Sequence, residues 1–247
     1  MPADPLVLLV VVAGSLFGAV ASGLAGFAFA AITLGLYAHF LPPGVISPLV
    51  VASSLAVQLI VLPMIWRRLD WRAALPFVVG GICGVPLGAA LLSVLSADTF
   101  RHAAGALLVL YSVSVLAARR LPALRIESRL ADAAVGLGGG VLGGFAGLSG
   151  ILPTIWCSLR RWPKDRQRSV FQLFNTAMHM VTLTVYAAQG RLTAEVGGLL
   201  VAALPAIGLG AWLGFSLYRR IDDKAFARVL LVLLGLSGLA LLAPVLG

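Results

Sequence analysis

One pattern occurs twice along the apolar length of this chain, and this repeat constrains the fold more than any other feature. The first copy reads Ser22-Gly23-Leu24-Ala25-Gly26-Phe27, followed by Thr33, Pro42, Ser54 and Gln58. A shift of 121 positions gives Gly143-Gly144-Phe145-Ala146-Gly147-Leu148, followed by Thr154, Pro163, Asn175 and His179. Each copy is a glycine-rich apolar segment, a prolyl turn and a helix with one polar stripe. Such paired, interrupted segments are typical of secondary transporters that bind substrate between two repeats.

Composition places nearly the whole chain in a membrane. The 247 residues are 60% hydrophobic and 11% charged, and the mean hydropathy is +1.03. A soluble domain needs far more polar surface, so we predict a single transmembrane domain over 1–247, without a signal peptide. Cys83 and Cys157 lie in or beside apolar runs without a CxxC motif, which indicates neither a zinc cluster nor a thiol relay. We expect no cofactor.

The apolar segments and the basic residues together predict the topology. The segments run at 5–41, 44–66, 73–96, 102–118, 130–158, 169–188, 196–218 and 225–246. Six fit a single crossing, which needs about 20 residues, whereas 5–41 and 130–158 are longer and are interrupted by glycine. Of the 18 Lys and Arg residues, all except Arg101 and Arg191 cluster after the second, fourth, fifth and seventh segments. All four clusters face the cytoplasm, as the positive-inside rule requires, if both long segments enter and return on the same side.

This arrangement defines the expected fold class. Each half is a returning helical hairpin plus three crossings, so the chain is an all-α polytopic membrane protein with two inverted-topology repeats. Repeat 1 covers 5–118, repeat 2 covers 130–246, and 119–129 is a cytoplasmic linker. Both termini then face outside, and the basic loops contact anionic lipid headgroups rather than nucleic acid, which explains the net charge of +9.

The hairpins are expected to lie inside the protein, tip to tip near the midplane. Irregular backbone at membrane depth is tolerated only where protein or a cavity surrounds it. The segment 130–158 is too short for two crossings, so at least this hairpin is re-entrant. The first hairpin is longer and could cross fully.

Polar side chains on two helices are the main site candidates. Gln172, Asn175, Thr176 and His179 fall at i, i+3, i+4 and i+7, on one helix face. Ser54 and Gln58 lie one turn apart and align with Asn175 and His179. Polar groups inside a membrane usually face partners or a water-filled cavity, and the alternative is that they bond helices together. Thr33 and Thr154 are further candidates, although membrane threonines often bond their own helix backbone.

Glycines at the hairpin tips suggest how a substrate is held. Gly26, Gly147 and Gly150 could expose backbone N–H groups that bind an anion, and close helix packing is the alternative. The Asp and Glu residues sit at span ends or in loops, so an anion is easier to hold than a cation. His179 is the titratable group deep in a span, most simply a neutral buried histidine that could tune pH dependence. Arg168 could attract the anion, but anchoring to headgroups is its simpler role.

A short motif raises the possibility of an enzyme. Gly147-Leu148-Ser149-Gly150 reads GxSG, and Ser149 with His179 would form the dyad of an intramembrane serine protease. Ala28 stands opposite Ser149 in the repeat, so the serine is not part of the repeated pattern, and such short motifs arise easily by chance. The protease therefore stays a second, less favoured class.

The repeated hairpin with its prolyl turn, at Ser22–Pro43 and Gly143–Pro163, and the polar-striped helix that follows resemble the TauE/SafE sulfite exporter family. The second copy, Gly147–Pro153, is closer to the glycine-rich motif of that family than the first. The resemblance implies a bacterial inner-membrane permease that moves sulfite, sulfoacetate or a related C2 sulfonate, usually outward. Small carboxylates are the alternative substrates. The expected partners are a small anion and membrane lipids, while a homo-oligomer and coupling to protons or another ion are left open.

Overall fold

The structure is a computed structural model that describes residues 4–118, 124, 126–220, 222 and 232. Within these residues every regular element is a helix. In chain order they are α1 (Pro5–Ala25), α2 (Phe29–Tyr37), α3 (Pro43–Ile65), the 3-10 turn η1 (Trp66–Arg68), α4 (Trp71–Val94), α5 (Ala97–Ala118), α6 (Arg129–Ala146), α7 (Ile151–Leu159), α8 (Lys164–Ala188) and α9 (Ala194–Tyr218). The predicted segment 225–246 lies almost wholly outside the described residues, as does the C-terminus.

Both long predicted segments are broken by a glycine in the left-handed region. Gly26 has φ 92° and ends α1, and Gly147 has φ 73° and ends α6. The helices that follow, α2 and α7, have nine residues each, which is about 14 Å of helix. A full crossing needs about 30 Å. The second limb of neither hairpin is long enough to cross a bilayer, so of the two forms left open for the first hairpin the structure has the re-entrant one.

Each hairpin turns back on itself. The Tyr37 hydroxyl, at the end of α2, donates to the Val11 carbonyl oxygen at 2.9 Å and lies 2.8 Å from the Ser15 hydroxyl on α1. Arg160, just after α7, forms an ion pair at 3.0 Å with Asp132 in the first turn of α6. Both second limbs therefore lead back toward the end of the molecule where the hairpin begins, which agrees with the prediction of returning hairpins.

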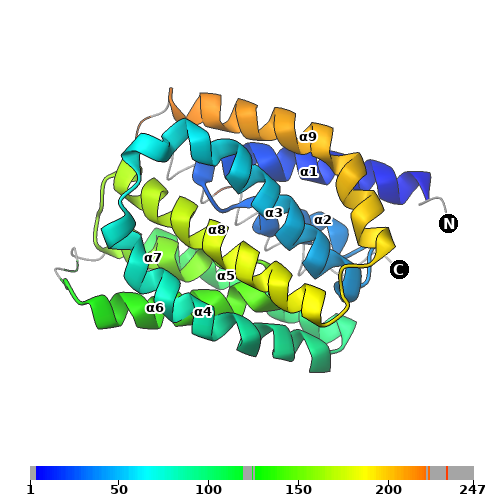
Figure 1. Ribbon diagram of the computed structural model, residues 1–247, viewed down its shortest axis with the longest axis horizontal. Coiled ribbons are helices and arrows are strands. Elements are labelled where there is room, and N and C mark those ends of the chain that lie inside the picture. Colours follow the sequence, from blue (N-terminus) through cyan, green and yellow to red (C-terminus); the bar gives the residue numbers. More distant parts are fainter. Residues whose placement is uncertain (1–3, 119–123, 125, 221, 223–231, 233–247) are drawn as a thin grey trace.

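Each hairpin is covered by a helix from the other half of the chain. In Figure 1, α9 lies along α1, and α4 lies along α6. The closest glycine contacts are Gly84 with Leu137, Gly88 with Val141, Gly210 with Leu16 and Gly214 with Val20. In both pairs, the glycine that comes later in its helix contacts the residue that comes later in the partner helix. The paired helices therefore run in the same direction. The residues met on α6 stand 121 positions after those met on α1.

Residues from the basic clusters gather at one end of the molecule. Polar contacts join the start of α8 to the start of α4, the end of α7 to the start of α6, and the end of α9 to the start of α8. They are Arg166–Asp70 (3.9 Å), Arg160–Asp132 (3.0 Å) and Tyr218–Asp165 (2.6 Å). At the opposite end, Arg191 in the α8–α9 connection donates to the Ser93 hydroxyl near the end of α4, at 2.7 Å. We call the first of these the basic end.

The helix lengths and composition identify a polytopic membrane protein. Among the described residues, four helical segments are long and apolar enough to cross a membrane: α1, α3 with η1, α4 and α9. The 25-residue α8 is not among them, because its charged first turn and its polar stripe lower its hydropathy. A helix that carries buried polar groups can therefore be long enough to cross a membrane and still be too polar to be recognised from hydropathy.

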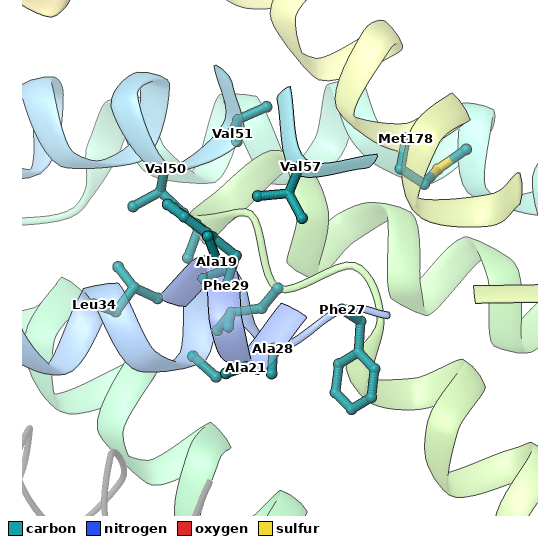
Figure 2. Packing of buried hydrophobic residues seen from close by; sticks show 14 of the residues in the cluster. Ala19, Ala21, Phe27, Ala28, Phe29, Leu34, Val50, Val51, Val57 and Met178 are labelled. Atoms are coloured by element: carbon teal, nitrogen blue, oxygen red, sulfur yellow. The ribbon is translucent and has the colours of Figure 1, made fainter. Parts of the chain in front are cut away.

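The apolar core surrounds the hairpin tips. Figure 2 shows Val50, Val51 and Val57 of α3 above Phe29 and Leu34 of the first hairpin, and all five side chains are at most 1% exposed. Burial on this scale fixes the first hairpin against α3. The tips are thus held by packing, which positions the polar groups described below.

Candidate functional site

The two hairpin tips meet between α3 and α8. A Cβ on Gly150 would stand 2.5 Å from the Cβ of Phe27, and a Cβ on Gly147 would stand 3.6 Å from the Cβ of Ala30. Gly150 can approach Phe27 this closely because it has no side chain. The tip-to-tip arrangement expected from the sequence is therefore present in the structure, with irregular backbone enclosed by protein as a membrane requires.

The tip of the first hairpin is held by both halves of the chain. The carbonyl oxygen of Gly26 accepts from Gln58 Nε2 of α3 at 2.8 Å and from Asn175 Nδ2 of α8 at 3.3 Å. Gln172 Nε2 donates to the backbone carbonyl of Gln58 at 2.8 Å. Three predicted site residues, Gln58, Gln172 and Asn175, thus converge on one tip. The side-chain amides of Gln58 and Asn175 can donate to the Gly26 carbonyl or turn away from it and donate to another acceptor.

The tip of the second hairpin approaches the same groups. The Ser149 hydroxyl donates to Asn175 Oδ1 at 2.6 Å. His179 faces the backbone of Gly147, although neither ring nitrogen makes a hydrogen bond to a described residue. His179 and Gly147 stand 121 positions after Gln58 and Gly26. The same helix position therefore faces the same hairpin glycine in both halves.

Several buried polar atoms at this junction have no hydrogen-bond partner among the described residues. They are Ser54 Oγ, Gln172 Oε1, both ring nitrogens of His179, Ser53 Oγ and Thr182 Oγ1. An unmet polar group in the interior costs about 1–3 kcal/mol, so a cluster of them indicates a place where a ligand or water completes the bonding. This observation favours a binding site over helix-to-helix bonding alone.

All eleven predicted site residues are buried, but not all join this network. The Thr33 hydroxyl donates to the carbonyl of Phe29, and the Thr154 hydroxyl donates to the carbonyl of Gly150, each four residues earlier in the chain. Both threonines therefore bond their own helix backbone, which is the alternative that the sequence left open.

The sequence did not predict two of these hydroxyls, those of Ser53 and Thr182. Thr182 lies three residues beyond His179, so an extended polar stripe would have found it. Ser53 lies next to Ser54, but on a helix adjacent residues point about 100° apart. Nothing in its spacing indicates that it also faces inward.

The geometry does not form a serine protease dyad. The Ser149 hydroxyl is engaged with Asn175, and within the described part of the chain no hydrogen bond joins it to His179. A nucleophile and its base need such a contact. The GxSG sequence is instead the tight turn of a hairpin tip, where small residues allow the two tips to touch.

Arg168 lies directly behind the first tip. Its Nη1 and Nη2 atoms donate to the carbonyls of Leu24 and Gly23 at 2.6 and 2.7 Å. These are carbonyls of the last turn of α1, where a cation is favoured by the helix dipole. The side chain is 2% exposed, so the headgroup-anchoring role expected from the sequence is wrong. A charged residue at a predicted span end turned inward because the hairpin tip offers it carbonyl acceptors.

The sequence matches the protein family described as Sulfite exporter TauE/SafE over residues 10–241. No curated protein and no solved structure shows a significant match. Because the family match covers most of the chain, the chain belongs to the TauE/SafE family. It is a multi-pass membrane transporter and not an enzyme.

Proposed function

We propose that this TauE/SafE transporter exports a small sulfur-containing anion, such as sulfite or a C2 sulfonate, across a bacterial inner membrane. The observation that carries the proposal is the junction of the two hairpin tips, where donors from both halves meet beside unpartnered buried polar atoms. Family membership supports the substrate class. Small carboxylates are the competing substrates, and a transport assay separates the two classes.

The chemistry of the site suits an anion with several oxygens. Among the described residues, no Asp or Glu takes part in the hydrogen bonds and close contacts of the tips, so no carboxylate of this set repels a negative charge there. Ser54 and His179 have unused hydrogen-bonding capacity. The amides of Gln58 and Asn175 now donate to the Gly26 carbonyl. When an anion binds, these amides can turn to its oxygens, and hydrogen bonds to a charged acceptor are stronger than those to a carbonyl.

Alternating access would follow from the arrangement of the two halves. We propose that 5–118 and 130–246 are inverted repeats joined by the linker 119–129 and that they rock against each other around the tips. Two observations support this. The residues that these glycines contact on α1 and on α6 stand 121 positions apart. The basic end holds the start of α6 but the end of α9, which runs parallel to α1. The burial of every site residue fits a conformation closed at both ends.

The test is flux of sulfite and sulfoacetate in proteoliposomes. We expect Asn175→Ala and Gln58→Ala each to lower the flux by at least roughly tenfold, because each loses a donor worth about 1.5–3 kcal/mol toward a charged oxygen. Thr184→Ala is the matched control on α8, since Thr184 is exposed and its hydroxyl bonds its own helix at Met180. This control should transport normally.

The outcomes separate the site from the substrate. Normal flux in both alanine variants would refute the site assignment. If the unmodified protein moves acetate but neither sulfite nor sulfoacetate, the substrate proposal is wrong. In that case the same two variants, assayed with acetate, still decide whether the hairpin tips form the site.

A further inference from the structure

Two residues in equivalent positions cap the two hairpins, and only one of them is charged. The Ser47 hydroxyl donates to the Phe145 carbonyl of α6 at 3.3 Å. Arg168 donates to the Leu24 carbonyl of α1 at 2.6 Å. Arg168 stands 121 positions after Ser47, and Phe145 stands 121 positions after Leu24. The structure therefore places a cation behind one tip and a neutral hydroxyl behind the other, in otherwise matching contacts.

Asp165 attracts the charge of Arg168 but forms no direct ion pair with it. The Arg168 side chain is buried, and within the described residues no ion pair joins it to an acidic group. Asp165, one turn earlier, accepts from the Tyr218 hydroxyl at 2.6 Å. The rings of Phe215 and Tyr218 lie 5.6 and 4.7 Å from the guanidinium carbon, and Nε has no partner. Burying a cation without a direct ion pair is unfavourable, so the surroundings of Arg168 favour an anion.

A cavity of about 270 Å³ leads to this side chain from the basic end. It lies between the ends of α3 and α9 and the start of α8, and its charged lining residues are Arg68, Asp165, Arg168 and Arg219. The positive charges outnumber the single negative one, which concentrates anions in the cavity. The volume greatly exceeds the roughly 30 Å³ share of one water molecule, so a small hydrated anion fits.

Arg168 separates this cavity from the hairpin tip. A Cβ on Gly26 would stand 3.2 Å from Arg168 Cδ, and the Gly26 carbonyl is the acceptor shared by Gln58 and Asn175. An anion in the cavity therefore meets this guanidinium next to the tip. There the anion would compete with the carbonyls of Gly23 and Leu24 for the Nη1 and Nη2 donors.

We propose that this cavity is the access vestibule at the basic end and that Arg168 is a charge gate between the vestibule and the site. The inference rests on the proposed function, because it concerns the path to the same site. An anion gathers in the vestibule, binds Arg168 and is handed to the amides at the Gly26 tip. The matching position on the other path, Ser47, carries no charge and holds an anion less tightly, which favours release on that side.

Charge-selective thiol labelling tests the gate without measuring transport. Ser169→Cys puts a thiol in the cavity lining beside Arg168, where the native hydroxyl is 2% exposed and accepts from the Asp70 N–H. Met64→Cys puts a second thiol at a lining residue that is 43% exposed. Both are made in a background in which Cys83 and Cys157 are replaced by alanine. The probes are a negatively charged sulfonatoethyl and a positively charged trimethylammonioethyl methanethiosulfonate. We expect the anionic reagent to react faster. Adding Arg168→Gln should reduce the ratio of the two rate constants by roughly tenfold, because one nearby charge acts oppositely on the two reagents.

Two further variants make the result specific. Arg168→Lys keeps the charge and should keep the ratio. Arg220→Gln removes a charge at the same end outside the lining of this cavity and should also leave the ratio nearly unchanged. A ratio that Arg168→Gln leaves unchanged at every reactive thiol would overturn the proposal, and so would a failure of both thiols, at positions 64 and 169, to react with either reagent.

A transport arm distinguishes failure of the gate from failure of the proposed function. If the unmodified protein moves sulfite and Arg168→Gln moves it equally well, the gate is wrong and the transporter proposal stands. If labelling depends on the charge of residue 168 but no sulfite flux occurs, the gate survives and the substrate is wrong. Sulfite at saturating concentration should also slow labelling at position 169 several-fold.

Discussion

A single backbone carbonyl organises the candidate site. The Gly26 oxygen accepts from Gln58 and Asn175, which come from different halves of the chain, while Asn175 also accepts from Ser149 at the other tip. One asparagine therefore touches both hairpins. A movement of either tip changes the bonds of Asn175, so under the proposed function this residue would couple substrate binding to tip movement.

The glycines that end α1 and α6 supply a prediction at the same scale. Gly26→Ala and Gly147→Ala should each lower stability by about 1–2 kcal/mol, because a β-carbon is disfavoured at positive φ. Crowding adds to this, since the new Cβ atoms would stand 3.2 Å from Arg168 Cδ and 3.1 Å from Val50 Cγ1. Thermal unfolding in detergent, followed by tryptophan fluorescence, measures the effect.

Gly197→Ala on α9 is the control for this experiment. Gly197 is exposed on a helix, and a Cβ there meets nothing within 4 Å. Alanine should therefore be neutral or stabilise by up to about 1 kcal/mol through helix propensity. If the two hairpin variants unfold at the same temperature as this control, the left-handed turns are not needed for the fold.

At the scale of elements, the glycines of α4 and α9 do a different job. Gly88 lies against the Val141 backbone of α6, and Gly214 lies against the Val20 backbone of α1, so a Cβ at either position would overlap a carbonyl oxygen. Small residues at such contacts let helix backbones approach closely, which is a main source of helix association in membranes. These two contacts attach each hairpin to the opposite half of the chain.

Gly88→Ala and Gly214→Ala should therefore destabilise the protein by similar amounts. Each added methyl forces two packed helices apart, which costs about 1–3 kcal/mol or more. Gly208→Ala on α9 is the control, because a Cβ at Gly208 meets nothing within 4 Å. The melting temperature in detergent should fall in the first two variants only. A large loss in one and none in the other would contradict the equivalence of the two contacts.

The sequence predicted the helices better than it predicted how they pair. The breaks fell at Gly26 and Gly147 inside the predicted tips, and α3 and α8 begin directly after the expected prolines. The helix α8 begins at Lys164 rather than at 169, since hydropathy reports membrane depth and not helical conformation. The pairing of α4 with α6 could not be predicted, because apolar residues all around a helix leave no face to identify its partner.

The same limit applies to the site. The stripe spacing identified Gln172, Asn175 and His179, because a helix places such residues on one face whatever its surroundings. The burial of Arg168 depends on carbonyls more than 140 residues away in sequence, and no local pattern reports such a contact. Sequence reasoning thus found the residues whose role follows from periodicity and missed the one whose role follows from tertiary packing.

For the whole molecule, the basic end carries the features of a membrane interface. Trp66 and Trp71 are each 55% exposed there, with ring centroids 5.6 Å apart, and aromatic residues of this kind favour the headgroup level. Arg67, Arg68 and Arg72 flank them in sequence. Basic residues next to an aromatic pair fit the cytoplasmic face, which attracts positive loops through its anionic lipids.

The orientation of the molecule gives the last prediction. The α8–α9 connection lies at the end opposite the basic clusters, so a thiol at Leu192, which is 45% exposed, should face outside. A thiol at Arg220, after α9, should face the cytoplasm. In a background without Cys83 and Cys157, a membrane-impermeant maleimide should label Leu192→Cys in intact cells and Arg220→Cys only in inside-out vesicles. The opposite labelling would reverse the positive-inside assignment, and labelling of both thiols from one face would mean that α9 does not cross. Since α1 runs parallel to α9, that last result would also contradict the entry of the two hairpins from opposite sides of the membrane. Alternating access depends on that arrangement.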